Sequence, residues 1–185
     1  MTPVRTAPTT ARRRPAPTRR DGLGFYAYTV RDVMTRKVIA VAPEASLATA
    51  AGLMSRYRVS GLPVVGPSRR VLGVISQKDI IRVLHDGTGL RMPGSVFDLI
   101  LSSGRDAPAG IAENGRRLLG RLRVRAAMRR PAITVAPDAS LDEAVRTLIA
   151  NRINRLPVVE GGYVVGIVTR HDLLTGLTPE EPVET

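Results

Sequence analysis

The stretch VRDVMTRKVIAVAPEASL at residues 30–47 returns as VRAAMRRPAITVAPDASL at residues 124–141, an offset of 94 positions. Over residues 30–65, 17 of 36 positions are identical to their partners at this offset. One residue is lost in a later turn, so that Asp79 aligns with Asp172 at an offset of 93. Self-similarity of this length indicates a duplicated unit of about 55 residues whose two copies bury a shared core.

Each copy of the unit is predicted to fold in the order β-α-β-β-α. A short extended segment ends at a proline, and Ser46 or Ser140 then occupies a helix N-cap, where its hydroxyl accepts a bond from a backbone amide. Two β-branched runs separated by a short turn predict a hairpin, and a last helix begins at Ser76 or Thr169. The predicted strands are 38–41, 62–65 and 71–75 in the first copy and 132–135, 156–159 and 164–168 in the second.

These spaced motifs resemble the CBS domain, the module named after cystathionine β-synthase. The first copy carries Met34-Thr35, Leu62-Pro-Val-Val and Gly73-Val-Ile-Ser followed by Asp79, and the second carries Leu156-Pro-Val-Val and Gly166-Ile-Val-Thr-Arg-His-Asp. The resemblance implies the α/β (α+β) class, with two motifs packed sheet to sheet as a pseudo-twofold pair. The repeat supports this packing independently, because a sheet with helices on one face needs a cover for its other apolar face.

Similarity to this family implies that adenosine-containing ligands bind in the clefts between the two motifs. There Asp79 or Asp172 accepts the ribose hydroxyls, while Ser76 or Thr169 and the helix N-terminus attract phosphate. Without the family, the same residues are explained as a capped helix with an acidic residue in its first turn. Both interpretations can hold together, because the cap positions the carboxylate.

The resemblance also assigns the adenine base to an apolar slot at the start of each first strand and at the bend before each Leu-Pro strand. Main-chain groups there bond the polar edge of the base. Without the family, these apolar side chains are ordinary core residues. The implied nucleotide-binding residues are Ile39, Val59, Ser60, Gly61, Pro63, Ser76, Lys78, Asp79, Ile133, Ile153, Asn154, Arg155, Pro157, Thr169, Arg170 and Asp172.

The two copies differ where Arg155 replaces Gly61. A guanidinium beside the cleft can bind a phosphate through two parallel hydrogen bonds, and the alternative is a solvated side chain. Lys78, Arg170 and His171 are secondary phosphate candidates, and the alternative for His171 is an exposed helix residue. We therefore predict unequal clefts, the tighter nucleotide site being centred on Asp172 and formed with Thr169, Ile133, Ile153 and Arg155.

The composition disfavours several classes of function. The 185 residues include no Cys and two His, so a thiolate nucleophile is excluded and a metal site would need carboxylates to complete it. We expect no catalytic residues and no metal ligands. No apolar stretch reaches the roughly 18 residues of a membrane span, so we expect no membrane contact. Aromatic residues are 3%, too few for stacking single-stranded bases.

The net charge of +12 is a property of segments. Residues 1–24 hold six Arg and one Asp among Pro, Thr and Ala, a composition that predicts a disordered arm. We place the first motif at 25–86 and the second at 124–177. The connector between them, 87–123, is predicted to be partly helical, with one helix capped at Ser95 and another over 111–122, and residues 178–185 form an acidic tail.

The function expected from these observations is a cytoplasmic regulatory module for energy sensing that binds AMP, ADP or ATP, with magnesium accompanying ATP. S-adenosylmethionine or a dinucleotide is an alternative ligand, and non-specific binding of nucleic acid through the basic arm and connector is an alternative function. We expect no cofactor beyond the ligand. We also expect a homodimer formed through apolar stripes on the helices at 46–57 and 140–151, with an unidentified protein partner as a further candidate.

Overall fold

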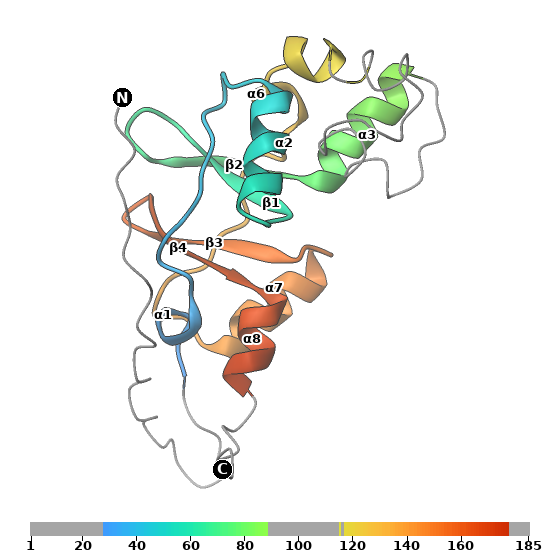
Figure 1. Cartoon of the computed structure of the whole chain (residues 1–185). Helices are drawn as coiled ribbons and strands as arrows, with labels where there is room; N and C mark the ends of the chain where they lie inside the picture. The colour runs from blue at the N-terminus through green and yellow to red at the C-terminus, as the bar shows by residue number, and fades with distance from the viewer. Residues whose placement is uncertain (1–27, 89–114, 116, 178–185) are drawn as a thin grey trace, which may run out of the picture.

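The computed structural model describes residues 28–88, 115 and 117–177, which form two motifs stacked one above the other (Figure 1). The hairpins of the two motifs face each other, and the longer helices lie on the outer sides. The first motif holds α2 (Leu47–Arg56), β1 (Gly61–Val65), β2 (Val71–Ser76) and α3 (Gln77–Thr88), and the second holds α7 (Leu141–Ala150), β3 (Arg155–Glu160), β4 (Tyr163–Thr169) and α8 (Arg170–Leu177). Two single-turn helices, α1 (Val30–Val33) and α6 (Val124–Ala127), precede the motifs.

The predicted caps and hairpins are confirmed. Ser46 accepts a hydrogen bond from the amide of Thr49, and Ser140 accepts one from the amide of Glu143, so the two long first helices begin where the sequence predicts. Strand β1 pairs antiparallel with β2, and β3 pairs antiparallel with β4. Each motif therefore combines helices with strands, and the described residues form two small antiparallel sheets, one in each motif.

The third strand predicted for each sheet is reduced to a single bridge. Val41 pairs in parallel with Val64, and Val135 pairs in parallel with Val158. The Val41 amide donates to the carbonyl of Pro63, and the Val65 amide donates to the carbonyl of Val41. Pairing one step earlier would need an N–H at residue 63, which is proline, so the ladder cannot extend toward Ile39. Pro157 has the same effect in the second motif.

The outer edge of each hairpin is paired with a segment of the other motif. Arg129 exchanges both backbone hydrogen bonds with Val74, and Thr35 exchanges both with Ile167. Such close approach requires glycine on the strand beneath, because a Cβ at Gly73 would lie 2.5 Å from the carbonyl oxygen of Arg129. The two motifs are thus joined by main-chain hydrogen bonds as well as by side-chain packing.

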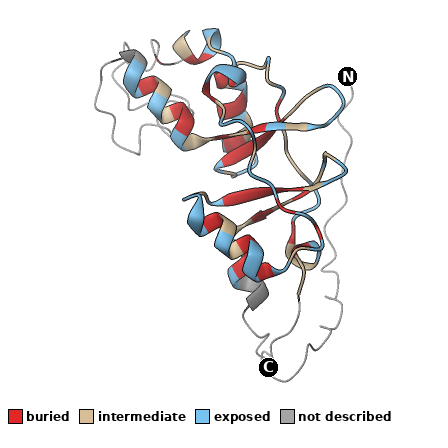
Figure 2. Ribbon diagram, turned by 180° about the vertical axis from the view of Figure 1, so that it is seen from behind, coloured by how far each residue is buried: buried red, intermediate tan, exposed pale blue. Residues whose placement is uncertain are grey.

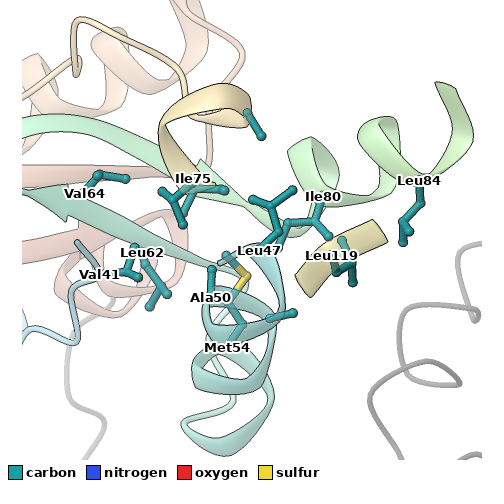
Figure 3. Packing of buried hydrophobic residues seen from close by; sticks show 13 residues of the cluster. Val41, Leu47, Ala50, Met54, Leu62, Val64, Ile75, Ile80, Leu84 and Leu119 are labelled. Carbon is teal, nitrogen blue, oxygen red and sulfur yellow. The ribbon is translucent and has the colours of Figure 1, made fainter. Parts of the chain in front are cut away.

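The single-turn helices also cross between motifs. Val124 and Ala127 of α6 belong to the core of the first motif, in which Leu47, Leu62 and Ile75 pack together (Figure 3), whereas Val30 of α1 and the adjacent Met34 belong to the core of the second. The Val30 amide donates to the carbonyl of Ala139, and the Val124 amide donates to the carbonyl of Ala45. Figure 1 shows α1 beside α8 and α6 beside α2. Each hydrophobic core therefore contains residues from both halves of the chain.

The prediction that an apolar stripe on the helix at 46–57 is exposed and forms a dimer surface is wrong for the principal residues of that stripe. Leu47, Ala50, Ala51 and Met54 are fully buried, because this face of α2 packs on its own sheet (Figure 2). On the helix at 140–151, Leu141, Ala144 and Leu148 are buried in the same way, whereas Ile149 is exposed. Homodimer formation stays a prediction.

Parts of the connector prediction can be compared with the structure. Residues 117–121 are helical, in agreement with the predicted second connector helix, and Leu119 packs into the first core. The arm at 1–24, the helix predicted at Ser95 and the tail at 178–185 lie outside the described residues. Within the described ranges, no helix is long and apolar enough to span a bilayer.

Candidate ligand cleft

A cleft of about 250 Å3 lies between the two motifs. The first motif contributes the end of the bend that precedes β1, together with the junction between β2 and α3. The second motif contributes the segment after α6 and the bend before β3. The lining residues are Ser60, Val74, Ser76, Gln77, Lys78, Asp79, Arg129, Pro131, Ala132, Ile133, Arg152, Ile153, Asn154 and Arg155.

Asp79 is the buried acidic residue of this cleft, with 1% of its surface exposed. Its Oδ2 accepts hydrogen bonds from the Ser76 amide at 3.0 Å and from the Ser76 hydroxyl at 2.5 Å, which holds the carboxylate in the first turn of α3. Its Oδ1 has only longer contacts, 3.4 Å to Arg82 Nη2 and 3.3 Å to Arg129 Nε. Both arginines are about half-exposed, so Oδ1 is the oxygen at which a ligand hydroxyl can replace a weak partner.

Arg155 begins β3 and is buried, with 9% of its surface exposed. Its Nη2 donates a hydrogen bond to the hydroxyl of Ser60 in the first motif. Burial lowers the pKa of Arg155 below its ordinary value, because desolvation disfavours the charged form. Guanidinium nevertheless stays protonated at neutral pH, so the cleft contains a buried positive charge. Among the described residues, no carboxylate pairs with it within salt-bridge distance.

Gly61 explains how the first motif accommodates this arginine. A Cβ at residue 61 would lie 2.7 Å from Arg155 Nη1 and 2.8 Å from the Ile75 carbonyl oxygen. Residues 61 and 155 occupy equivalent positions in the two copies, and the Arg155 side chain approaches the backbone of Gly61 across the motif boundary. The difference between the copies is therefore complementary, since glycine on one side leaves room for arginine on the other.

The cleft also has an apolar wall from the second motif. Ile133 is 37% exposed, although it is a large hydrophobic residue, and Ile153 is half-buried. Pro131 and Ala132 lie in the same segment. A flat apolar ligand group that covered Ile133 would remove its side chain from water, which is favourable at roughly 25 cal/mol per Å2.

The structure brings together half of the predicted binding residues in this cleft. Present are Ser60, Ser76, Lys78, Asp79, Ile133, Ile153, Asn154 and Arg155. Residues that do not line it are Ile39, Val59, Gly61, Pro63, Pro157, Thr169, Arg170 and Asp172. Ile39 and Val59 pack against the first core, and the Thr169 hydroxyl at the start of α8 donates a 2.6 Å hydrogen bond to Asp172.

The predicted grouping of residues is wrong in one respect. Ile133, Ile153 and Arg155 were assigned to a cleft with Asp172, whereas they line the cleft that contains Asp79. The cause is the bridge between Arg129 and Val74, which lays the segment leading to Ile133 beside the first motif. The alternative of a solvated Arg155 is also wrong, because this side chain is buried.

Sequence reasoning did not identify Arg129 and Arg152 as cleft residues. Arg129 reaches the cleft because its backbone pairs with Val74, and Arg152 lies in the left-handed bend after α7 with a φ of 52°. No pattern in the sequence distinguishes either residue from an arginine on an ordinary solvent-exposed surface. The available signal was the identity of Arg152 with Arg58, its counterpart at the same bend in the first copy, which also has a φ of 52°.

Comparison with known proteins identifies the family. The CBS domain model matches residues 30–86 and 124–178. An uncharacterized protein of Methanocaldococcus jannaschii, MJ1426, is 33% identical over 154 residues, which cover 80% of this chain and 90% of that protein. Inosine-5'-monophosphate dehydrogenases also match, but the chain spans only 22% of the length of those from Methanocaldococcus jannaschii and Korarchaeum cryptofilum.

Solved structures show the same architecture. The CBS domain of a CBS domain containing membrane protein from Sphaerobacter thermophilus has a TM-score of 0.67 at 29% identity, covering 84% of this chain and 90% of that one. The crystal structure of CBSX2 in complex with AMP has a TM-score of 0.58 at 25% identity, covering 80% of this chain and 95% of that one. With two matched segments that each contain one helix-hairpin-helix unit preceded by a β-bridge, the chain belongs to the CBS domain family as a tandem CBS pair.

Proposed function

We propose that this protein is a regulatory module that binds an adenine nucleotide in the cleft of Asp79. The observation that carries the proposal is the meeting of a buried carboxylate, a buried guanidinium and an exposed isoleucine in one cleft, from both motifs. These are the three kinds of group that ribose, phosphate and adenine require. The AMP complex of the related CBSX2 supports the same class of ligand.

Each part of the nucleotide has a proposed partner. Ribose hydroxyls bond Oδ1 of Asp79, whose other oxygen is already occupied by the cap of α3. The base lies against Ile133 and Ile153. A phosphate approaches Arg155 and the N-terminus of α3, where backbone amides and the helix dipole favour negative charge. Because these groups come from both motifs, the ligand bridges the motif boundary and can alter how the two halves pack.

The proposal is tested by calorimetric titration of the full chain and two isosteric variants with AMP and ATP. Asp79→Asn removes the negative charge of the side chain that accepts hydrogen bonds from the ribose hydroxyls. We therefore expect nucleotide affinity to fall roughly tenfold to a hundredfold, as for the loss of a charge-assisted hydrogen bond. Asp172→Asn is the matched control, since Asp172 holds the equivalent cap in the second motif but does not line this cleft.

Two outcomes would contradict the proposal. One is the absence of binding by either nucleotide to the wild-type chain at millimolar concentration. The other is a loss of affinity in Asp172→Asn that equals or exceeds the loss in Asp79→Asn, which would place the ligand at the other motif's helix.

A further inference from the structure

The positive charge of the cleft is larger than a single phosphate group can neutralise. Four cationic side chains line it, Lys78, Arg129, Arg152 and Arg155, against the single acidic residue Asp79. Arg155 is buried and the other three are exposed. The cleft therefore combines one buried guanidinium with three cations that solvent reaches.

The three exposed cations come from separate parts of the chain. Lys78 lies in the first turn of α3, Arg129 lies on the segment that pairs with β2, and Arg152 lies in the bend after α7. Arg129 contacts Asp79 at 3.3 Å, a long contact to a carboxylate that Arg82 shares. For Lys78 and Arg152 the described residues offer no acidic partner within 4.0 Å.

The chemistry of the ligand follows from this arrangement. A nucleoside monophosphate places its one phosphate beside the buried Arg155, and the exposed Lys78 and Arg152 keep their positive charge without an acidic partner among the described residues. Each further phosphate adds negative charge and acceptor oxygens that can pair with these exposed cations. A sulfonium nucleoside would instead add positive charge to a cleft that already holds an excess, which costs free energy through like-charge repulsion.

We infer that the cleft selects an adenosine ligand that carries two or three phosphates over a monophosphate or a sulfonium nucleoside. This inference rests on the proposed function, since it assumes that the nucleoside lies against Asp79 and Ile133. Arg155 holds the first phosphate, and Lys78 and Arg152 determine the preference for a longer phosphate chain.

The test is calorimetry of the full chain with AMP, ADP, ATP and S-adenosylmethionine in EDTA, so that the phosphates carry their full charge. We expect ATP to bind at least roughly tenfold more tightly than AMP, and S-adenosylmethionine to bind more weakly than AMP. In the double variant Lys78→Gln/Arg152→Gln, ATP affinity should fall roughly tenfold while AMP affinity changes less than about twofold.

The matched control is Arg56→Gln/Arg146→Gln, which removes the same net charge from the surfaces of α2 and α7 outside the cleft. It should leave the preference for ATP over AMP unchanged. Equal affinities of the wild-type chain for AMP and ATP would overturn the inference while leaving the proposed function intact. The same holds if both double variants weaken ATP alike, because general attraction would then account for the preference. Failure of all four ligands to bind would overturn the proposed function itself.

Discussion

Arg155 combines a cost in stability with a proposed role in nucleotide binding. The residue is 9% exposed and its hydrogen-bond acceptor is the neutral hydroxyl of Ser60, so desolvation is only partly offset. Replacing a buried ion pair with apolar residues of similar volume is often neutral or stabilising, by up to about 4 kcal/mol, and a single buried charge bears the same kind of desolvation cost. The residue is thus explained better by what it offers a ligand than by what it contributes to the fold.

At this residue, stability and affinity should change in opposite directions. In Arg155→Met without ligand, we expect the free energy of unfolding to rise by about 1 kcal/mol and Tm to rise by about 2–4 °C. Nucleotide affinity should fall at least roughly tenfold, since the phosphate loses a charge-assisted partner. Scanning calorimetry and titration measure the two effects separately. A fall in Tm with unchanged affinity would show that Arg155 has a structural role alone.

Among the elements, the crossed segments connect packing to the ligand cleft. The segment leading from α6 to Ile133 is held against β2 by the two hydrogen bonds between Arg129 and Val74. Gly73 lies beneath that contact, and Gly166 lies beneath Met34 in the other motif. The same substitution at these equivalent positions therefore meets a rigid backbone in one case and a flexible side chain in the other.

Gly73→Ala should accordingly be more damaging than Gly166→Ala. Its methyl group would lie 2.5 Å from the Arg129 carbonyl oxygen, so the segment that carries Ile133 must shift. We expect Gly73→Ala to lose about 1–3 kcal/mol in the free energy of unfolding, a typical cost of overpacking, and to weaken nucleotide binding. Gly166→Ala displaces the Met34 side chain and should leave nucleotide affinity within about twofold. Urea unfolding and calorimetry give the comparison, and equal effects on affinity would contradict the proposed connection.

The elements themselves were largely predictable, but their partners were not. Ser46 and Ser140 marked helix starts because an N-cap hydroxyl is a local requirement, and the hairpins followed from apolar runs with a short turn. A repeated sequence indicates which residues are equivalent, yet Arg155 could meet either Asp79 or Asp172 without changing any local pattern. That choice is set by contacts between the copies, such as the pairing of Arg129 with Val74. The position of Arg129 in the cleft was missed for the same reason.

On the scale of the whole molecule, neither motif completes its core alone. The first core includes Val124 and Ala127, and the second includes Val30 and Met34. Polar contacts cross in the same way, since Arg31 pairs with Glu160 and Arg125 pairs with Glu44, both at 2.9 Å. These ion pairs are exposed and worth little, so the coupling rests on the shared apolar cores and on the main-chain hydrogen bonds between the motifs.

The pair should consequently unfold as one cooperative unit. We expect a single calorimetric transition whose van't Hoff and calorimetric enthalpies agree, and a nucleotide should shift that transition upward as a whole. Val30→Ala should lower the same single transition, by roughly 1–3 kcal/mol at the midpoint, rather than separate a second one. Two resolved transitions, with only one of them sensitive to Val30→Ala, would show that the motifs fold independently.

The central claim, that an adenine nucleotide binds between the motifs at Asp79, is tested most directly by a crystal structure of the full chain grown with ADP. We predict that a ribose hydroxyl lies within hydrogen-bond distance of Asp79 Oδ1, that the base covers Ile133, and that a phosphate oxygen contacts Arg155. A nucleotide seated at Asp172 with the Asp79 cleft empty would contradict the account.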